Sequence, residues 1–248
     1  MPLTVTPPSC RSRTAPPGIP REARSVVARI IGHLTALEQA PCSSPLDTPF
    51  LDHWLAFLGE VDSFQQCVIA HSDYTVTCSR GCADCCYHWV EDVNSFEAEI
   101  ISATLKRQFP DRIEAILQTC RTDIAELERL DSLVQERLQG QNLQSPEADP
   151  DPVDLLLHVY YRMRRPCPLL DGDGSCMVYE VRPLTCRMYL SFSDPIRCDP
   201  DYIDPETTST CMLDLSERAN AILDRLHFTY LRHEGDTGLR SLLAKYLA

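Results

Sequence analysis

The sequence predicts a mostly α-helical fold, a helical bundle with an irregular, loop-built, cysteine-rich metal centre. Three observations predict it. Apolar residues recur at intervals of three and four along much of the chain, the spacing of amphipathic helices. No stretch alternates between apolar and polar residues for the length of a strand. The segment 166–211 is rich in cysteine, proline and glycine but has no long period, so we expect loops that a bound group organises.

Proline and capping residues place the helices. We expect helices from 21 to just before Pro41 and from 49 to 70, because a proline disfavours helix at the residue before it. The next begins at Asn94 or Ser95, which can cap it, and ends before Pro110. The remaining predicted helices are 110–140, 153–162, 213–226 and 238–247. The polar, proline-rich stretch 141–152 is predicted to be a loop.

Composition changes sharply after the first twenty residues, which hold six prolines and few large apolar side chains. Such a segment cannot bury enough surface to offset its chain entropy, so residues 1–20 are predicted to be a disordered tail. Residues 21–248 are predicted to form a single helical domain with a cysteine-cluster core at 77–211. A chain of this length can bury a sound core without disulfides.

Charge and hydropathy exclude several classes of function. The net charge of −13 argues against nucleic-acid binding, which needs a surplus of cations. No apolar run of about 18 residues exists, so no membrane span is expected. The start of the chain lacks a basic stretch followed by an apolar run, so we expect a cytoplasmic protein. In that reducing compartment, clustered cysteines are more often metal ligands or catalytic than disulfide-bonded. The composition names no protein partner.

Eight of the thirteen cysteines form two groups. The first is a dense block and the second is spread over the segment that follows the 153–162 helix: Cys78, Cys82, Cys85 and Cys86, then Cys167, Cys176, Cys186 and Cys198. Short spacings let one loop turn several thiolates toward a common centre, with Gly81 able to supply a positive φ. Adjacent side chains tend to diverge, so Cys85 and Cys86 favour two metals or a cluster over one tetrahedral ion.

Three further patterns carry a resemblance: the Cys-Cys pair that ends the first block, Cys-Pro-Leu-Leu from Cys167, and Tyr-Glu-x-Arg-Pro-x-x-Cys-Arg from Tyr179 to Arg187. Over residues 77–198 the chain resembles the YkgJ-type cysteine-cluster family, described as a zinc- or iron-chelating CxxCxxCC domain. It also resembles the related domain of flagellin lysine N-methylases. The C-x3-C opening departs from the family's C-x2-C. The resemblance implies that the eight grouped cysteines are the metal-binding set.

Neighbouring residues have two interpretations each. Arg182 and Arg187 either offset thiolate charge or pair with surface acids. Tyr179 and Glu180 are expected to anchor the loop. His88 is a weaker candidate for a nitrogen ligand, and Cys211 is an outside candidate. The other cysteines are interpreted as free thiols or, for the one on a helix stripe, as a buried hydrophobe: Cys10, Cys42 and Cys67, and Cys120.

The predicted function is that of a cytosolic metal-binding protein that holds zinc or an iron–sulfur cluster, since both accept thiolates. Two alternatives stay open. One is a metal-dependent enzyme, methyltransferase-like or redox, which the flagellin methylase resemblance implies but no glycine-rich cofactor loop or nucleophile–base pair supports. The other is a scaffold in which the metal is purely structural.

Overall fold

A computed structural model of the chain describes residues 20–39, 42–71, 75–78, 81–140, 152–202, 210–233 and 238–248. The predicted disordered tail lies outside these residues except for Pro20, and the predicted 141–152 loop lies outside except for Pro152. The described part is mostly α-helical, as predicted, with α-helices and one small two-stranded sheet. None of its helices is both long enough and apolar enough to cross a membrane.

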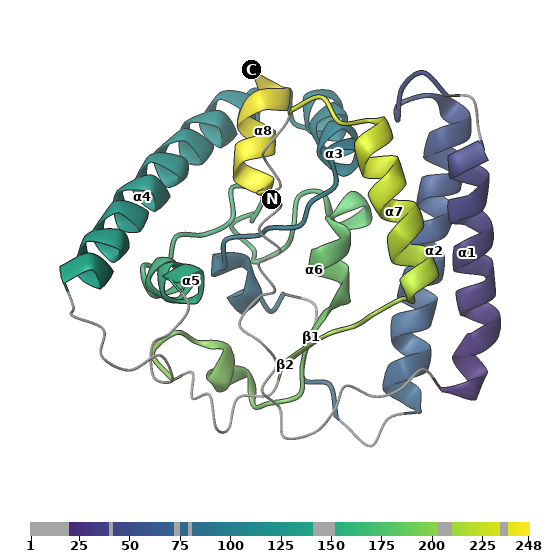
Figure 1. Cartoon of the computed structure of the whole chain (residues 1–248), viewed down its shortest axis with the longest axis horizontal. Coiled ribbons are helices and arrows are strands. Elements are labelled where there is room, and N and C mark those ends of the chain that lie inside the picture. The colour runs from purple at the N-terminus through teal and green to yellow at the C-terminus, as the bar shows by residue number, and fades with distance from the viewer. Residues whose placement is uncertain are drawn as a thin grey trace.

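The helices form two groups with irregular segments between them (Figure 1). On one side lie α1 (Arg24–Gln39), α2 (Thr48–Ala70) and α7 (Glu217–Thr229). On the other lie α4 (Ile113–Gly140) and α5 (Pro152–Arg162), while α3 (Ser95–Gln108) and α8 (Leu239–Leu247) lie together along one edge. Between the groups run short elements: α6 (Leu184–Met188), β1 (Tyr189–Ser191) and β2 (Thr210–Met212).

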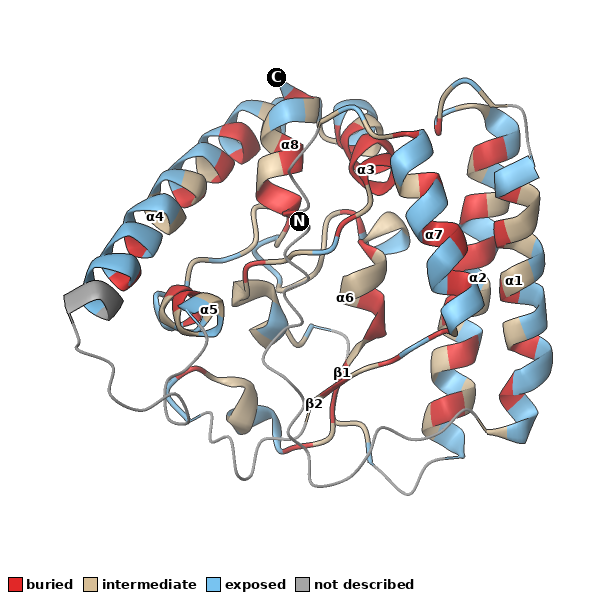
Figure 2. Ribbon diagram, viewed as in Figure 1, coloured by how far each residue is buried: buried red, intermediate tan, exposed pale blue. Residues whose placement is uncertain are grey.

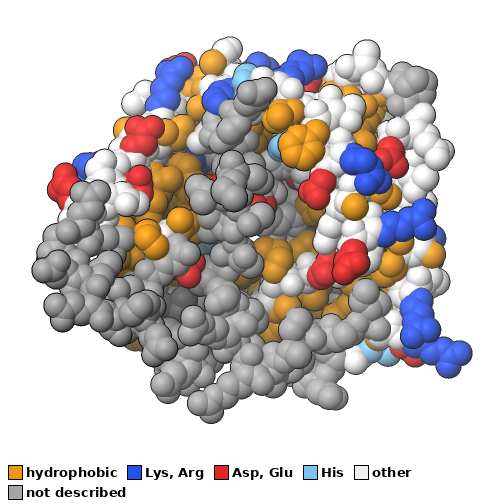
Figure 3. All heavy atoms as spheres, viewed as in Figure 1, with side chains coloured by type: hydrophobic (Ala, Val, Ile, Leu, Met, Phe, Trp, Pro, Cys, Tyr) orange, Lys and Arg blue, Asp and Glu red, His pale blue; other side chains and the backbone are white. Residues whose placement is uncertain are grey.

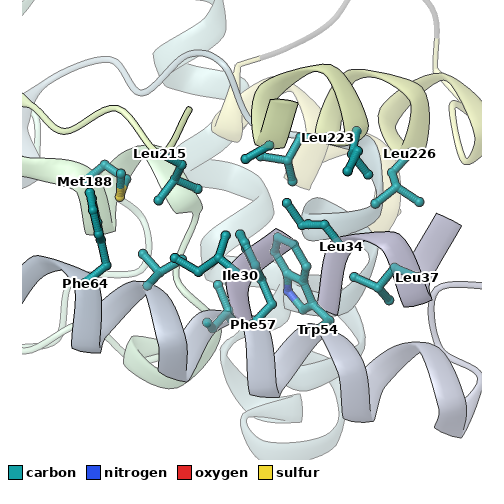
Figure 4. Close-up of a cluster of buried hydrophobic side chains, with 14 of the residues drawn as sticks. Ile30, Leu34, Leu37, Trp54, Phe57, Phe64, Met188, Leu215, Leu223 and Leu226 are labelled. Carbon is teal, nitrogen blue, oxygen red and sulfur yellow. The ribbon is translucent and has the colours of Figure 1, made fainter. Parts of the chain in front are cut away.

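The first core lies where α1, α2 and α7 meet. The apolar residues that recur at helical spacing in the sequence are the buried ones, including Ile30 and Leu34 of α1. Trp54 and Phe57 of α2 stack at 4.8 Å between ring centroids. Figure 4 shows these side chains facing Leu223 of α7. This packing confirms the two predicted N-terminal helices.

A second core joins α3, α4 and α8, and a smaller third one joins α4 to α5. Along α4 the buried residues form one stripe and the exposed residues the opposite face (Figure 2). Cys120 is fully buried on that stripe, as expected for a small hydrophobe. Trp89, from the loop before α3, packs in the third core against Tyr160.

The segment 166–211 is more ordered than the sequence predicts. It contains the helix α6, and β1 pairs with β2 in antiparallel register, with Leu190 opposite Cys211. The prediction that 166–211 forms only irregular loops is therefore wrong in part, although the fold remains mostly helical as predicted. Strands of three residues are too short for an alternating pattern, and their pairing depends on contacts between segments distant in sequence.

Surface charges of both signs are mixed. On the face drawn in Figure 3, Lys and Arg side chains lie among Asp and Glu side chains. The basic stretch at the end of α5 is neutralised by acids: Arg164 pairs with Asp199 and Asp201 at 2.6 and 2.8 Å. Arg165 pairs with Asp123 at 2.6 Å. These cations therefore join α5 to neighbouring segments.

Candidate metal centre

The eight grouped cysteines lie on the irregular segments between the two helix groups. Cys85 and Cys86 belong to the short 3-10 helix Asp84–Tyr87, Cys186 to α6 and Cys198 to the 3-10 helix Pro195–Cys198. Cys78 and Cys85 are exposed residues, and the other six are partly buried. Their sulfur atoms are therefore held on loops that the surrounding helices position.

Two glycines bring the two cysteine segments together. Gly81 and Gly174 both have positive φ, 87° and 81°, a conformation that favours glycine. A Cβ on Gly174 would lie only 3.1 Å from the carbonyl oxygen of Gly81. The positive φ predicted for Gly81 is confirmed, and this close approach explains why the later turn also needs glycine.

Ser191 of β1 holds two distant cysteines. Its backbone N–H donates to the Sγ of Cys78 at 3.2 Å, and the Cys198 thiol donates to its Oγ at 3.3 Å. The hydroxyl of Tyr161, on α5, donates to the carbonyl oxygens of both Cys198 and Asp84. The Cys82 thiol in turn donates to the Asp84 carboxylate at 3.6 Å. The structure thus gathers the start of the first block and the last cysteine of the second group around β1.

Cys167, Cys176 and Cys186 lie on segments that are held by other contacts. The backbone N–H of Cys167 donates to the carbonyl of Cys86 at 2.7 Å. Cys176 forms an isolated antiparallel bridge with Leu170, three residues after Cys167. Cys186 sits on α6, where Glu97 of α3 accepts the backbone N–H of Leu184 at 2.7 Å. One loop pairing and one helix contact therefore place these thiols.

Cys85 differs from the other grouped thiols in the direction of its pKa shift, which is downward. Its charge contributes to a raised pKa at each of the other seven cysteines. Burial is the largest cause for six of them, whereas for Cys86 the largest cause is its hydrogen bond to Cys85. The same bond is the largest cause of the lowered pKa of Cys85. Within the adjacent pair, the pKa of Cys85 is therefore lowered while that of Cys86 is raised.

Burial keeps most of the set neutral in the metal-free protein. It raises the pKa of Cys176 to about 11 and that of Cys186 well above its usual value. Metal ligation requires the deprotonated thiolate, so binding at neutral pH must release protons. Within the described residues, no three or more His, Cys, Asp or Glu side chains are arranged closely enough to hold a metal ion as they stand. The donor chemistry fits a thiophilic metal, and closure around one requires the loops to tighten.

The two arginines of the Tyr179–Arg187 motif divide the roles considered for them. Arg187 is buried and its guanidinium bonds both carboxylate oxygens of Asp62 at 2.6 Å. It also donates to the backbone carbonyls of Tyr179 and Glu180. Arg182 stacks over the Tyr179 ring at 3.9 Å, and its charge lowers the pKa of Cys85, after the bond from Cys86. Arg187 thus anchors the loop to α2, whereas Arg182 reaches Asp62 only at 3.9 Å and is also one of the causes that lower the pKa of Cys85.

The remaining candidate ligands and free thiols make contacts other than with the eight grouped cysteines. His88 stacks face to face on Tyr161 at 3.8 Å between centroids, and burial lowers its pKa to about 4. Cys211 is buried in β2, where its thiol donates to the Met212 carbonyl. Cys42 and Cys67 pack beside the first core. Cys10 lies outside the described residues.

Comparison with known families gives the centre its context. Residues 77–211 match the family model CxxCxxCC, described as a "putative zinc- or iron-chelating domain". The match covers more than half of the chain. The chain belongs to the CxxCxxCC family. The description of this family therefore gives metal chelation by a cysteine-rich domain as its activity. No curated protein and no solved structure matches the chain significantly.

One group of site residues lies partly outside the CxxCxxCC segment and was missed by sequence reasoning. Asp123 of α4, only 2% exposed, pairs with both Arg165 and the fully buried Arg240 of α8. Arg240 also lies near the rings of Trp89 and Tyr160. The available signal was Asp123 itself, a carboxylate three residues after Cys120 on the apolar stripe of a helix, where a buried charge needs a partner.

Proposed function

We propose that this protein binds metal in the cytosol, holding zinc or an iron–sulfur cluster through the thiolates of its two cysteine groups. The observation that carries the proposal is that hydrogen bonds join the two cysteine segments: the backbone N–H of Cys167 donates to the Cys86 carbonyl at 2.7 Å, and Ser191 contacts the sulfur atoms of both Cys78 and Cys198. Thiolates formed together on these segments would repel one another, and a bound cation removes that repulsion.

The donor set selects the class of metal. Thiolate sulfur is a soft ligand that suits zinc and iron–sulfur clusters, whereas calcium and magnesium take oxygen ligands. Four thiolates complete one closed zinc site or one cluster. The proposed ligands are eight, enough for two such units: Cys78, Cys82, Cys85 and Cys86, and Cys167, Cys176, Cys186 and Cys198.

The surrounding residues supply the conditions that ligation needs. The hydrogen bond from Cys86 and, after it, the charge of Arg182 lower the pKa of Cys85, and a lowered pKa favours the ionised form that binds metal. Ser191 donates its backbone N–H to Cys78, a hydrogen bond of the kind that tunes thiolate ligands. The cytosolic setting follows from the cysteine chemistry, because a reducing compartment keeps such thiols available.

The test is the metal content of protein purified without air, combined with its visible absorption spectrum. We expect either zinc in a colourless protein, or iron and sulfide with a visible charge-transfer band. Cys85→Ser should lose most of the bound metal. The matched control Cys67→Ser, on α2 beside the first core, should retain it. Wild-type protein with neither zinc nor iron would contradict the proposal.

A further inference from the structure

The C-terminal helix α8 docks directly on the backbone that follows the first cysteine block, although it lies beyond the CxxCxxCC segment. The backbone N–H of Leu239 donates to the carbonyl of Val90 at 2.9 Å. Gly238, just before α8, lies so close that a Cβ there would meet the Trp89 indole nitrogen at 3.2 Å and the Glu91 carboxylate at 3.3 Å. The start of α8 is thus fitted to residues 89–91.

The side chain of Arg240 continues this contact into the cysteine loops. Its guanidinium donates to the carbonyl of His88 at 3.3 Å and to that of Pro166 at 3.2 Å. His88 follows Cys86 by two residues, and Pro166 immediately precedes Cys167. These are the two cysteines joined by the 2.7 Å backbone hydrogen bond. The Arg240 side chain therefore bonds to both backbone segments at the point where the two cysteine groups meet.

The environment of Arg240 fixes that span. The side chain is fully buried, and its Nε donates to Asp123 Oδ2 at 2.8 Å. Its charge centre lies 5.3 and 5.5 Å from the ring centroids of Trp89 and Tyr160. A buried cation with a carboxylate on one edge and carbonyls on the other has little freedom to move.

We propose that Arg240 is a positioning residue of the thiolate centre, so that α8 acts together with the CxxCxxCC segment in metal binding. The inference rests on the proposed function, since it presupposes that the thiolates bind metal. Within the part of the chain that the structure describes, the hydrogen bonds of Arg240 go to Asp123 and to backbone carbonyls and none goes to a sulfur atom; the residue acts through the backbone that carries Cys86 and Cys167.

Only a guanidinium satisfies this geometry. Arginine has five N–H donors in a rigid plane, so one edge can bond Asp123 while the other bonds the two loop carbonyls. Lysine keeps the charge but concentrates it on one nitrogen and cannot serve both edges at once. Replacement by lysine therefore removes the hydrogen bonds to the loop carbonyls while leaving a cation near Asp123.

The first test compares Arg240→Lys with Arg165→Lys. Both arginines bond Asp123, from opposite oxygens, and both variants keep their charge. The Arg165 side chain is partly exposed, so its replacement tests the shared ion pair without the loop span. Metal affinity is measured anaerobically by competition with a chromophoric chelator, at a temperature where helical circular dichroism shows all three proteins folded.

We expect Arg240→Lys to weaken metal binding by about 10- to 100-fold, the usual effect of losing a residue that orients metal ligands. Arg165→Lys should stay within about threefold of wild type on the same basis. Equal effects of the two substitutions, or wild-type affinity in folded Arg240→Lys, would overturn the inference.

A second test needs no variant and decides the matter if Arg240→Lys does not fold. Linkage is reciprocal: if docked α8 favours metal binding, bound metal must favour docked α8. Amide hydrogen exchange of the wild-type protein should slow in α8 as metal is added, with the same concentration dependence as at residues 88–90 and 167–169. Metal binding without slower exchange in α8 overturns the inference alone, whereas absence of metal binding overturns the proposed function.

Discussion

A hydrogen bond between the adjacent thiols Cys85 and Cys86 lowers the pKa of the first and raises that of the second. Cys85 is also an exposed residue. Thiolate fraction and access together control cysteine reactivity. In metal-free protein at neutral pH we therefore expect iodoacetamide to modify Cys85 well before Cys176, whose pKa is raised to about 11 by burial.

Mass spectrometry of peptides after a short alkylation pulse measures this order. Buried Cys120, whose pKa is raised to about 12, should stay unmodified in the folded protein and serves as the internal control. Bound metal should protect Cys85. Alkylation of Cys176 ahead of Cys85 would contradict the assigned direction of the two pKa shifts.

His88 should make the fold sensitive to acid. Burial lowers its pKa to about 4 in the folded protein, against about 6.5 in the unfolded chain. Between these two pKa values the folded protein binds fewer protons than the unfolded chain. The free energy of unfolding is therefore unaffected by His88 above about pH 6.5 and decreases as the pH falls toward 4. The resulting loss at pH 5 is about 2 kcal/mol.

The replacement His88→Phe keeps an aromatic ring to stack on Tyr161 and removes the titrating group. Urea unfolding of metal-free wild-type and variant protein at pH 7 and pH 5 gives the comparison. The variant should lose less stability on acidification than the wild type. Identical pH dependence in both proteins would show that His88 does not titrate in this range.

At the residue scale, sequence reasoning identified the cysteines better than the residues that position them. The thiols are recognisable because their spacing is local, and all eight lie within residues 77–211, the segment that matches the family model. Arg240 was missed because a lone arginine at the start of a helix is typical of a surface. Its importance arises only from partners at Asp123, His88 and Pro166, which the fold brings together across long separations in sequence.

At the scale of elements, Glu97 connects two helices. Its Oε2 accepts the backbone N–H of Asn94 at 3.0 Å, as in a capping box at the start of α3. Its Oε1 accepts the backbone N–H of Leu184 at the start of α6, the helix of Cys186. The residue is buried, and burial raises the pKa of its carboxyl group, against these bonds.

Glu97→Ala should therefore cost more than the loss of a helix cap. It removes the acceptor for two backbone N–H groups in a buried place, and we expect a loss of about 2–4 kcal/mol. The control Asn94→Ala affects only the start of α3 and should cost about 1 kcal/mol. Urea unfolding measures both. Equal losses would mean that the Glu97–Leu184 contact contributes nothing to stability.

The elements themselves were predictable in proportion to their length. The stripes of α1, α2 and α4 span several turns, and hydrophobic burial alone identifies them. The seventh helix begins at Glu217, four residues after the predicted Leu213, because Ser216 caps it and accepts the N–H of Ala219. The short α6, β1 and β2 depend on partners such as Glu97 and Ser191, so local pattern carries no signal for them.

At the scale of the whole molecule, the cysteine segments lie between separately packed cores. Trp54 belongs to the first core, and Trp89 belongs to the third, three residues after Cys86. Val181, from the motif between Cys176 and Cys186, packs against both the first and the second core. Metal held by these segments would tie the cores together, because its ligands come from chain that contacts each of them.

This arrangement predicts that metal determines how cooperatively the protein unfolds. A ligand at about 1,000 times its dissociation constant stabilises the state that binds it by about 4 kcal/mol. That stabilisation acts on the loops around Trp89 directly, whereas the Trp54 ring packs against Phe57 of α2 and Phe96 of α3. After chelation we expect the region of Trp89 to unfold at lower urea concentration than the region of Trp54.

The chain has two tryptophans, so fluorine NMR of protein labelled with 5-fluorotryptophan reports each region without altering the site. Trp54→Phe assigns the two resonances. In metal-loaded protein both native resonances should disappear over the same urea range, because the loops and both cores then unfold together. In chelated protein the Trp89 resonance should disappear first. Coincident loss of the two resonances in chelated protein would mean that the cores are joined by their own packing, and that the metal stabilises the site without joining them.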